Sequence, residues 1–328
     1  MDSRARVEAA LRGETADRPP AGAWGHTYRE EWDPEQLARV TVDRARRLDW
    51  DFVKFQPRAT FFAEAFGNSY RASGHRFRGP ILEHAAVPDL DAWRSLELVN
   101  QSVLDEQARA LGLVVQELGD RVPVIQTVFS PLSVGDYLVG RDKRRLVREL
   151  RQHPDLVLPA LEKVQDALID FGRKSVLAGA AGVFYAISGF ATRDAMPVDV
   201  YDQLVFPMDL RLIEALPAAA WFNVVHLCGS HLNMDVARRL PVSAVSYSMH
   251  NAGNPSLAEA RRLTGKAVMG GLEQRRVLAT GPAEAIEGQV RDAIAETGGR
   301  GLLLAPGCSV PPRARESNLA LMMEAAAA

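Results

Sequence analysis

The chain has 328 residues, a hydrophobic fraction of 47% and a formal net charge of −2. This near-neutral balance argues against nucleic acid or an anionic membrane surface as the main partner. No apolar run approaches the roughly 18 residues that cross a bilayer, and the start, Met1–Arg6, lacks the apolar core of a signal peptide. We therefore expect a cytoplasmic protein whose two cysteines stay reduced.

The first hundred residues combine regular elements with an irregular stretch. The expected elements are a helix over 3–12, an extended segment over 21–26, a helix over about 33–48 and a strand over 52–56. Asp33 is a good N-cap for the second helix, and Pro34 suits its first position. Residues 58–100 then break the rhythm with several glycines and scattered aromatic residues, so we expect an excursion that forms small hairpins or a lid.

From residue 101 onward helical patterns alternate regularly with apolar strands. The predicted helices cover about 101–118, 141–152, 155–177, 198–217, 231–240, 256–264 and 281–297, followed by a closing helix. The predicted strands cover 123–129, 182–188, 224–229, 243–247, 266–270 and 301–307. Eight apolar strands, each followed by a helix, predict an α/β protein with a single-domain (β/α)8 TIM barrel over residues 1–328. The rival is an open doubly wound sheet, but no G-x-G-x-x-G follows the first strand. We expect the 58–100 excursion near the barrel mouth.

Three side chains with affinity for soft metals stand at the ends of predicted strands. His226 and Cys228 are two residues apart, and because side chains alternate along a strand they point to the same face. Cys308 follows the last strand, and the carboxyl ends of barrel strands meet at one rim. A His-x-Cys pair alone is more often packing, but a third soft ligand favours a metal site. One imidazole and two thiolates favour zinc over magnesium or calcium, and three protein ligands leave a fourth position open for catalysis.

Other polar residues at or just beyond strand ends are weaker candidates. The candidate catalytic residues are His26, Tyr185, His250 and Glu273, and the candidate cofactor-binding residues are Gln126, Ser188 and Tyr247. Glu273 could complete the zinc shell in the resting state, and His26 or His250 could orient or deprotonate an acceptor. Taken singly, each is more simply a satisfied polar group that lines a wet barrel mouth.

Several stretches of the sequence resemble the signatures of the uroporphyrinogen decarboxylase superfamily. These stretches are Leu11–Glu14, Asp17–Pro20, His226–Gly229, Met269–Leu272 and Ala305–Pro312. Because they are spread over nearly the whole chain, the resemblance implies one uroporphyrinogen decarboxylase-like TIM barrel over residues 1–328.

The resemblance leaves two kinds of activity to be separated. True uroporphyrinogen decarboxylases carry an arginine-rich loop after the first strand, which binds the substrate carboxylates, and an aspartate after the second. This chain has Trp24–Arg29 and Lys54–Pro57 at those places, and Cys308 stands where those enzymes carry a histidine. A substrate with many carboxylates needs several fixed cations. The first of these places offers a single arginine, Arg29, which is too few. The decarboxylase, a carboxy-lyase of tetrapyrrole biosynthesis, is therefore disfavoured.

The other branch consists of zinc-dependent methyltransferases that move a methyl group from a corrinoid protein to a thiol. Their zinc motif, His-x-Cys with a late Cys, matches His226, Cys228 and Cys308. The resemblance thus implies a methyltransferase with Zn²⁺ as cofactor, a methyl-corrinoid as co-substrate on a carrier protein, and a small thiol as acceptor. A non-catalytic metal- or corrinoid-binding accessory protein is the remaining alternative. The basic run Lys143–Arg145 is then a solvated helix face or, as the minor alternative, a docking patch for an acidic carrier.

Overall fold

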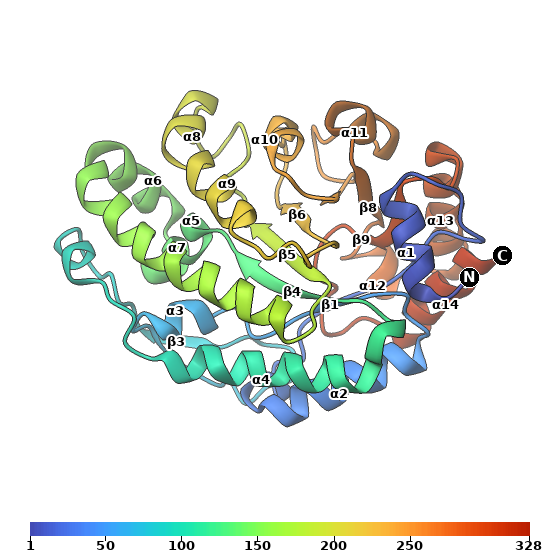
Figure 1. The fold of residues 1–328 in the computed structure, drawn as a ribbon, viewed down its shortest axis with the longest axis horizontal. Helices are drawn as coiled ribbons and strands as arrows, with labels where there is room; N and C mark the ends of the chain where they lie inside the picture. Colours follow the sequence, from blue (N-terminus) through green and yellow to red (C-terminus); the bar gives the residue numbers. More distant parts are fainter.

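The computed structural model describes residues 1–328 and has a curled parallel sheet at its centre (Figure 1). Seven strands form this sheet, in the order β1-β4-β5-β6-β7-β8-β9. Their bounds are β1 (Val53–Phe55), β4 (Val124–Phe129), β5 (Gly182–Ile187), β6 (Val224–Leu227), β7 (Ala244–Ser246), β8 (Ala267–Leu272) and β9 (Leu302–Pro306). Every residue of these strands is buried, as expected for a parallel sheet that helices cover.

The sheet closes into a barrel through the segment that lies between β9 and β1. On one side the Leu304 N–H donates to the Pro20 carbonyl (2.8 Å), and on the other the Asp51 N–H donates to the Ala21 carbonyl (2.9 Å). Only a single parallel bridge, at Ala21, forms here, so the extended segment expected over 21–26 does not become a regular strand. Pro20 has no N–H to contribute to a ladder. The predicted barrel is confirmed, with seven regular strands and one bridge.

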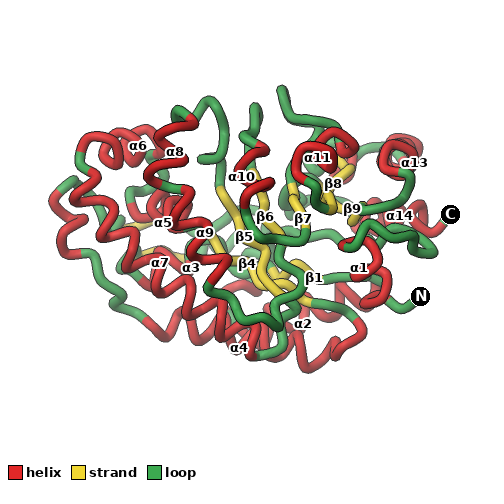
Figure 2. The backbone as a smooth tube through the Cα atoms, turned by 45° about the horizontal axis from the view of Figure 1, so that its top comes forward, coloured by secondary structure: helices red, strands yellow, loops and turns green.

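The helices lie outside the strands and surround them (Figure 2). They are α1 (Ser3–Leu11), α2 (Pro34–Arg47), α3 (Phe61–Ala65), α4 (Gln101–Leu118), α5 (Pro131–Leu138), α6 (Lys143–Gln152), α7 (Pro154–Leu177), α8 (Val198–Leu204), α9 (Phe206–Glu214), α10 (Met234–Arg239), α11 (Leu257–Thr264), α12 (Val277–Thr280), α13 (Ala283–Thr297) and α14 (Glu316–Ala327), with short 3-10 helices η1 (Glu30–Trp32), η2 (Asp91–Ser95) and η3 (Gly119–Arg121). Side-chain caps explain where two of these helices begin. Asp33 before α2 and Asp142 before α6 each accept a hydrogen bond from a backbone N–H in the first turn of the helix.

Two helices differ from the sequence prediction. Helix α5 was not predicted, although Ser130 caps it and a proline occupies its first position, which is a start signal. The single helix expected over 198–217 is divided at Val205 into α8 and α9. Pro207 explains the division, because a proline removes a helical N–H and its ring clashes with the preceding turn.

Residues 58–100 leave the barrel pattern, as predicted. Within them β2 (Ser69–Arg71) and β3 (Ile81–His84) form an antiparallel hairpin between α3 and η2. Two contacts hold this excursion against the end of α5: Asn68 Nδ2 donates to the Tyr137 carbonyl (2.7 Å), and the Val87 N–H donates to the Leu138 carbonyl (3.1 Å).

One hydrophobic core of 92 buried residues joins the strands, the surrounding helices and the excursion. Val87 and Trp93 from the excursion belong to this core, so the whole chain packs as one unit. The two termini lie near each other in Figure 1. None of the helices combines the length and the apolar character that spanning a lipid bilayer requires.

Candidate metal centre

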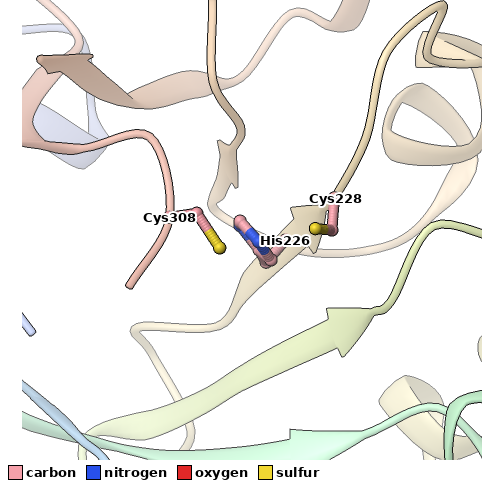
Figure 3. Close-up of side chains that lie close together, drawn as sticks. All are labelled: His226, Cys228 and Cys308. Atoms are coloured by element: carbon pink, nitrogen blue, oxygen red, sulfur yellow. The ribbon is translucent and has the colours of Figure 1, made fainter. Parts of the chain in front are cut away.

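The three ligand candidates that the sequence predicts lie together where the barrel strands end (Figure 3). The ligand atoms of His226, Cys228 and Cys308 all lie within 4.8 Å of one another. His226 belongs to β6, Cys228 follows that strand directly, and Cys308 follows β9. In Figure 3 both sulfur atoms are turned toward the imidazole, one from either side. His226 is buried and the two free cysteines are half-buried, so the cluster is largely screened from bulk water.

Backbone contacts fix the turn that carries Cys228. Its N–H donates to the Ile187 carbonyl at the end of β5 (3.2 Å). Gly229 then has a φ of +124°, a conformation that favours glycine. The Gly229 carbonyl accepts amide N–H groups from Asn251 and Asn254, both at 2.9 Å. The chain therefore turns away directly after Cys228 and leaves its thiol at the rim.

A close backbone approach fixes Cys308. The N–H of the preceding Gly307 donates to the Leu272 carbonyl at the end of β8 (3.0 Å). A Cβ atom on Gly307 would lie 2.6 Å from the Cα of Ser248, so a larger residue cannot be accommodated without backbone movement. The tight packing of two neighbouring loops thus sets the position of the second thiol.

The His226 ring is held by a hydroxyl and by an aromatic ring. Its Nδ1 atom lies 3.1 Å from Ser246 Oγ, on the neighbouring strand β7. The parallel register pairs these two residues directly. Phe184 on β5 stacks on the imidazole with ring centres 5.1 Å apart. Because Ser246 engages Nδ1, the atom left to bind a metal is Nε2.

The two thiols differ in acidity because they lie close to each other and to His226. The interaction with the neighbouring Cys228 thiol lowers the pKa of Cys308 well below its ordinary value, although burial opposes this, and His226 and the Ser309 N–H act in the same direction. The pKa of Cys228 is raised, because its thiol lies beside Cys308 and is buried. One of the two sulfurs is thus favoured as a thiolate, which is the form that binds a metal.

The donor set and its spacing fit a zinc ion. Zinc binds thiolate sulfur at about 2.3 Å and imidazole nitrogen at about 2.0–2.1 Å, so ligand atoms on a tetrahedral ion lie roughly 3.5–3.8 Å apart. Donors that already lie within 4.8 Å of one another need to approach by roughly 1.0–1.3 Å at most. Three protein ligands leave the fourth position to an exchangeable group.

Glu273, expected as a possible fourth ligand, uses its carboxylate elsewhere. The two oxygens accept backbone N–H groups from Arg275 (2.9 Å), Arg276 (2.8 Å) and Val277 (3.0 Å). Partial burial alone would raise the pKa of Glu273, but these three bonds outweigh it and lower the pKa. Glu273 therefore closes its own turn after β8, and it does not belong to the three-residue cluster.

The two histidines predicted at the rim have different surroundings. His26 is half-buried, with Nδ1 2.8 Å from Glu31 Oε1 and Nε2 3.1 Å from Gln56 Nε2. His250 is exposed, and its Nε2 atom donates to the Gly271 carbonyl at 3.0 Å. His26 thus joins a network of polar side chains, whereas His250 is bonded to the backbone at the surface.

Tyr185 does not face the mouth, contrary to expectation. The strand register pairs Ala186 with His226, so the side chain of Tyr185 points to the opposite face of the sheet. Its hydroxyl donates to Asp209 Oδ1 on α9 (2.6 Å), and the residue is fully buried. A catalytic role for Tyr185 is therefore corrected to a packing role between β5 and α9.

Of the three predicted cofactor-binding residues, two lie away from the barrel mouth and one lies at its rim. Gln126 is fully buried, and its Nε2 atom donates to the Thr127 carbonyl (3.0 Å). Tyr247 is buried as well, and its hydroxyl donates to the Ser256 carbonyl (2.9 Å). Gln126 shares the outward face of the sheet with Tyr185, and Tyr247 reaches the segment before α11, so neither lines the barrel interior as expected. Ser188 remains a candidate at the rim, half-buried and directly after β5.

The structure also contradicts the expectations for His231 and Lys143. His231 was expected to begin a helix, but α10 begins at Met234, since His231 has a φ of +50° and its Nδ1 lies 2.7 Å from Asp194 Oδ2. Lys143 was expected on a solvated helix face. It is half-buried instead, and its amine donates to the Ser188 carbonyl.

The sequence did not single out Ser246 and Phe184, which contact His226, or Lys54, which contacts Phe184. Strand alternation carries the signal for all three, because the register places each on the inward face that His226 also occupies. Lys54 is only 6% exposed, and its Nζ lies 4.8 Å from the Phe184 ring centre. Burial lowers the pKa of Lys54 to about 7, although Cys308 and Glu31 act in the opposite direction.

Comparisons with known proteins agree with this architecture. Residues 2–328 match the model of the family described as uroporphyrinogen decarboxylase (URO-D). The chain is 22% identical to the methylcobamide:CoM methyltransferase MtbA of Methanosarcina mazei, over 98% of this chain and 96% of that one. It is 26% identical to the uroporphyrinogen decarboxylase of Dichelobacter nodosus, over 96% and 94%. The solved structure of a methyltransferase from Methanosarcina mazei superposes with a TM-score of 0.83 at 20% identity, covering 99% and 98% of the two chains.

Proposed function

The chain belongs to the uroporphyrinogen decarboxylase (URO-D) family, and within it we propose a zinc-dependent methyltransferase that moves a methyl group from a protein-bound methyl-corrinoid to a small thiol. The observation that carries this proposal is the convergence of His226, Cys228 and Cys308 within 4.8 Å. Such a ligand set, with one position free, is typical of catalytic zinc. Similarity to a methylcobamide:CoM methyltransferase over nearly the whole chain supports the choice of donor and acceptor.

The reaction needs a thiolate, and a free thiol with a pKa near 8.5 is mostly protonated at neutral pH. A zinc ion held by the three residues supplies the positive charge that favours the thiolate. In the overall reaction the acceptor loses the proton from its sulfur and gains the methyl group as a sulfur–carbon bond forms. The cobalt–carbon bond breaks, and the electron pair stays with the cobalt.

The chain's own residues supply orientation and exclusion of water. The Ser246 hydroxyl keeps the His226 ring in place and directs Nε2 toward the two sulfurs. Phe184 and Trp24, with ring centres 5.3 Å apart, form an apolar wall beside the imidazole. A wall of this kind keeps water away from the acceptor sulfur and from the methyl group, so that the thiolate is the available nucleophile.

Two observations favour this activity over decarboxylation of a tetrapyrrole. Arg29 is exposed, and its guanidinium donates to the Gly74 carbonyl at 3.4 Å, so it does not form part of a cluster of cations inside the barrel. Gln56 stands after β1, where the decarboxylase pattern calls for an aspartate, and it is bonded to His26. A substrate with many carboxylates would find one buried lysine inside the barrel, Lys54. Lys143 at the rim is already bonded to the Ser188 carbonyl, so the mouth lacks a set of several free, fixed cations.

The proposal is tested with purified, zinc-loaded protein, free methylcobalamin as donor and a panel of small thiols as acceptors. We expect a methyl thioether by mass spectrometry and loss of methylcobalamin absorbance in equal amounts. Chelation of the metal should abolish the transfer, and zinc should restore it. Release of carbon dioxide from uroporphyrinogen, with no methyl transfer to any thiol, would contradict the proposal in favour of the decarboxylase.

A further inference from the structure

A basic groove lies between helix α6 and the segment that follows β5. Its volume is about 650 Å³, which falls in the range of roughly 300–1,000 Å³ that small-molecule sites occupy. Four cationic side chains line it: Lys143, Arg144, Arg148 and Arg151. The one carboxylate in the lining, that of Asp194, lies 2.7 Å from His231 Nδ1. The groove thus concentrates positive charge on a protein whose formal net charge is −2.

The three arginines of the groove form a stripe along one face of α6. Because they stand at positions i, i+4 and i+7, they span about 10 Å along the helix axis. All three are exposed and none pairs with a carboxylate, whereas Arg145 on the same helix pairs with Glu149 (2.7 Å). Like charges at these spacings repel each other and destabilise a helix. The chain supplies no counter-charge that relieves this repulsion, and a bound anion would supply one.

Lys143 holds a fixed position in this groove. Its amine donates to the Ser188 carbonyl and lies 4.9 Å from the ring centre of Phe190. An ammonium group has three N–H donors, and Ser188 occupies one of them. The apolar part of the lining comes from Val147, Phe190 and Ala195. The groove therefore combines several positive charges with an apolar patch, which suits an organic anion.

The groove lies next to the metal centre but includes none of its three residues. Gly189 marks the point where the two approach, since a Cβ atom on this glycine would lie 2.7 Å from Lys143 Nζ and 3.5 Å from the Cys228 carbonyl oxygen. Binding in the groove can therefore be measured separately from binding at the metal.

We propose that this groove binds a small organic molecule that carries more than one phosphate group. A guanidinium group presents its N–H donors in a planar fork that matches phosphate oxygens, so a row of arginines suits phosphates that are spaced along the ligand. Lys143 adds donors beside the row, and the organic body lies against the apolar side chains. A hollow of this size favours a small molecule over an acidic protein face, which needs a broader contact of about 800 Å² per partner.

Calorimetric titration of zinc-loaded protein at low salt, where screening is weak, tests this assignment. The probe is fructose 1,6-bisphosphate, and adipate, a six-carbon dicarboxylate, is its counterpart without phosphate. Wild-type protein should bind the bisphosphate at least about tenfold more tightly than adipate. Arg148→Gln, in the middle of the stripe, should weaken bisphosphate binding about tenfold through the loss of a charge-assisted hydrogen bond, and Arg148→Lys should restore part of it. Arg39→Gln is the matched control, because Arg39 is an exposed arginine on α2, outside the groove, and should leave the affinity unchanged.

A titration of His226→Ala with the same bisphosphate separates the groove from the metal centre, and its affinity should equal that of wild type. Loss of binding in this variant would place the phosphates on the metal and overturn the proposal. Equal or tighter binding of adipate by wild-type protein would overturn it in favour of a surface for carboxylates, as on an acidic protein. Equal affinities of wild type and Arg148→Gln would also overturn it. None of these results bears on methyl transfer to a thiol, so this proposal can fail while the proposed function stands.

Discussion

The Nδ1 atom of His226 lies 3.1 Å from the hydroxyl of Ser246, its direct partner on the next strand. This contact leaves Nε2 as the imidazole atom that can meet the sulfurs of Cys228 and Cys308. The orientation of the ring is therefore a property of two barrel strands. It precedes any metal binding.

Removing the Ser246 hydroxyl should weaken metal binding without unfolding the barrel. We expect Ser246→Ala to lower zinc affinity by about 10- to 100-fold, because the ring loses the group that fixes its orientation. A competition titration with a chromophoric chelator measures this change. Ser243→Ala is the control, since Ser243 lies just before the same strand and its hydroxyl donates to the Trp221 carbonyl instead (2.9 Å). Equal zinc affinities of the two variants would show that the hydroxyl does not orient the ring.

Adding one methyl group at Gly307 should disturb the metal centre through the backbone. The new Cβ would lie 2.6 Å from the Cα of Ser248, so the loop that carries Cys308 must move. We expect Gly307→Ala to reduce the free energy of unfolding by about 1–3 kcal/mol and to lower zinc affinity. In Gly288→Ala, on α13, no heavy atom lies within 4 Å of the added group, and stability should rise by about 0.4–1 kcal/mol. Chemical denaturation of both variants checks the prediction, and a Gly307→Ala protein as stable as wild type would contradict it.

The buried carboxylate of Asp51 should be essential for closing the barrel. It accepts hydrogen bonds from Arg6 (2.5 Å), Arg18 (2.5 Å) and the Ala21 N–H (2.9 Å). Asp51→Ala removes the buried acceptor that Arg6, Arg18 and the Ala21 N–H share, and only Arg6 keeps another carboxylate, Asp17. We therefore expect a loss of about 3–5 kcal/mol in the free energy of unfolding. Removing the exposed carboxylate of Glu117, which pairs with Arg46, should cost at most about 1 kcal/mol. Similar losses in the two variants would contradict the special role of Asp51.

The stability of the protein should depend on pH through Asp209. Burial raises the pKa of this carboxyl to about 7, although hydrogen bonds from Tyr185 and Tyr201 oppose the shift. The folded state therefore holds a proton that the unfolded state releases near pH 4. The contribution of this proton to the stability of the folded state is therefore complete below about pH 4 and is lost as the pH rises through 7. Between pH 5 and 7, the free energy of unfolding of Asp209→Asn should rise relative to that of wild type by up to about 1.4 kcal/mol per pH unit.

Urea unfolding at several pH values measures the Asp209 effect. The control is Asp292→Asn, which changes an exposed carboxylate on α13 and should follow the wild-type pH dependence. Parallel stability curves for wild type and Asp209→Asn would contradict a raised pKa.

The alternation of strands and helices was enough to predict the barrel and the meeting of His226, Cys228 and Cys308. Two-residue spacing placed the first two on one face, and the common rim of parallel strands brought in the third. The orientation of Tyr185 could not be predicted in the same way. It depends on which face of β5 turns inward, and that is fixed by the register with β6. The role of Glu273 depends on a local turn whose N–H groups occupy its carboxylate.

Contacts between segments that are far apart in the chain could not be predicted from the sequence. Lys54 and Gln56 are two residues apart in the sequence. His26 and Glu31 reach them only because the chain between α1 and β1 packs between β9 and β1 in the barrel. A lysine in an apolar strand is nevertheless a signal that sequence reasoning can use, because a buried amine requires an explanation.

The most direct measurement is the zinc content of the purified protein and of three single variants, His226→Ala, Cys228→Ala and Cys308→Ala. Elemental analysis after dialysis against a weak chelator should find about one zinc ion per wild-type chain and close to none in each variant. Circular dichroism should report the same secondary structure for all four proteins, which separates loss of the metal from loss of the fold. A Cys308→Ala protein that retains as much zinc as wild type would contradict the claim that these three side chains bind one ion.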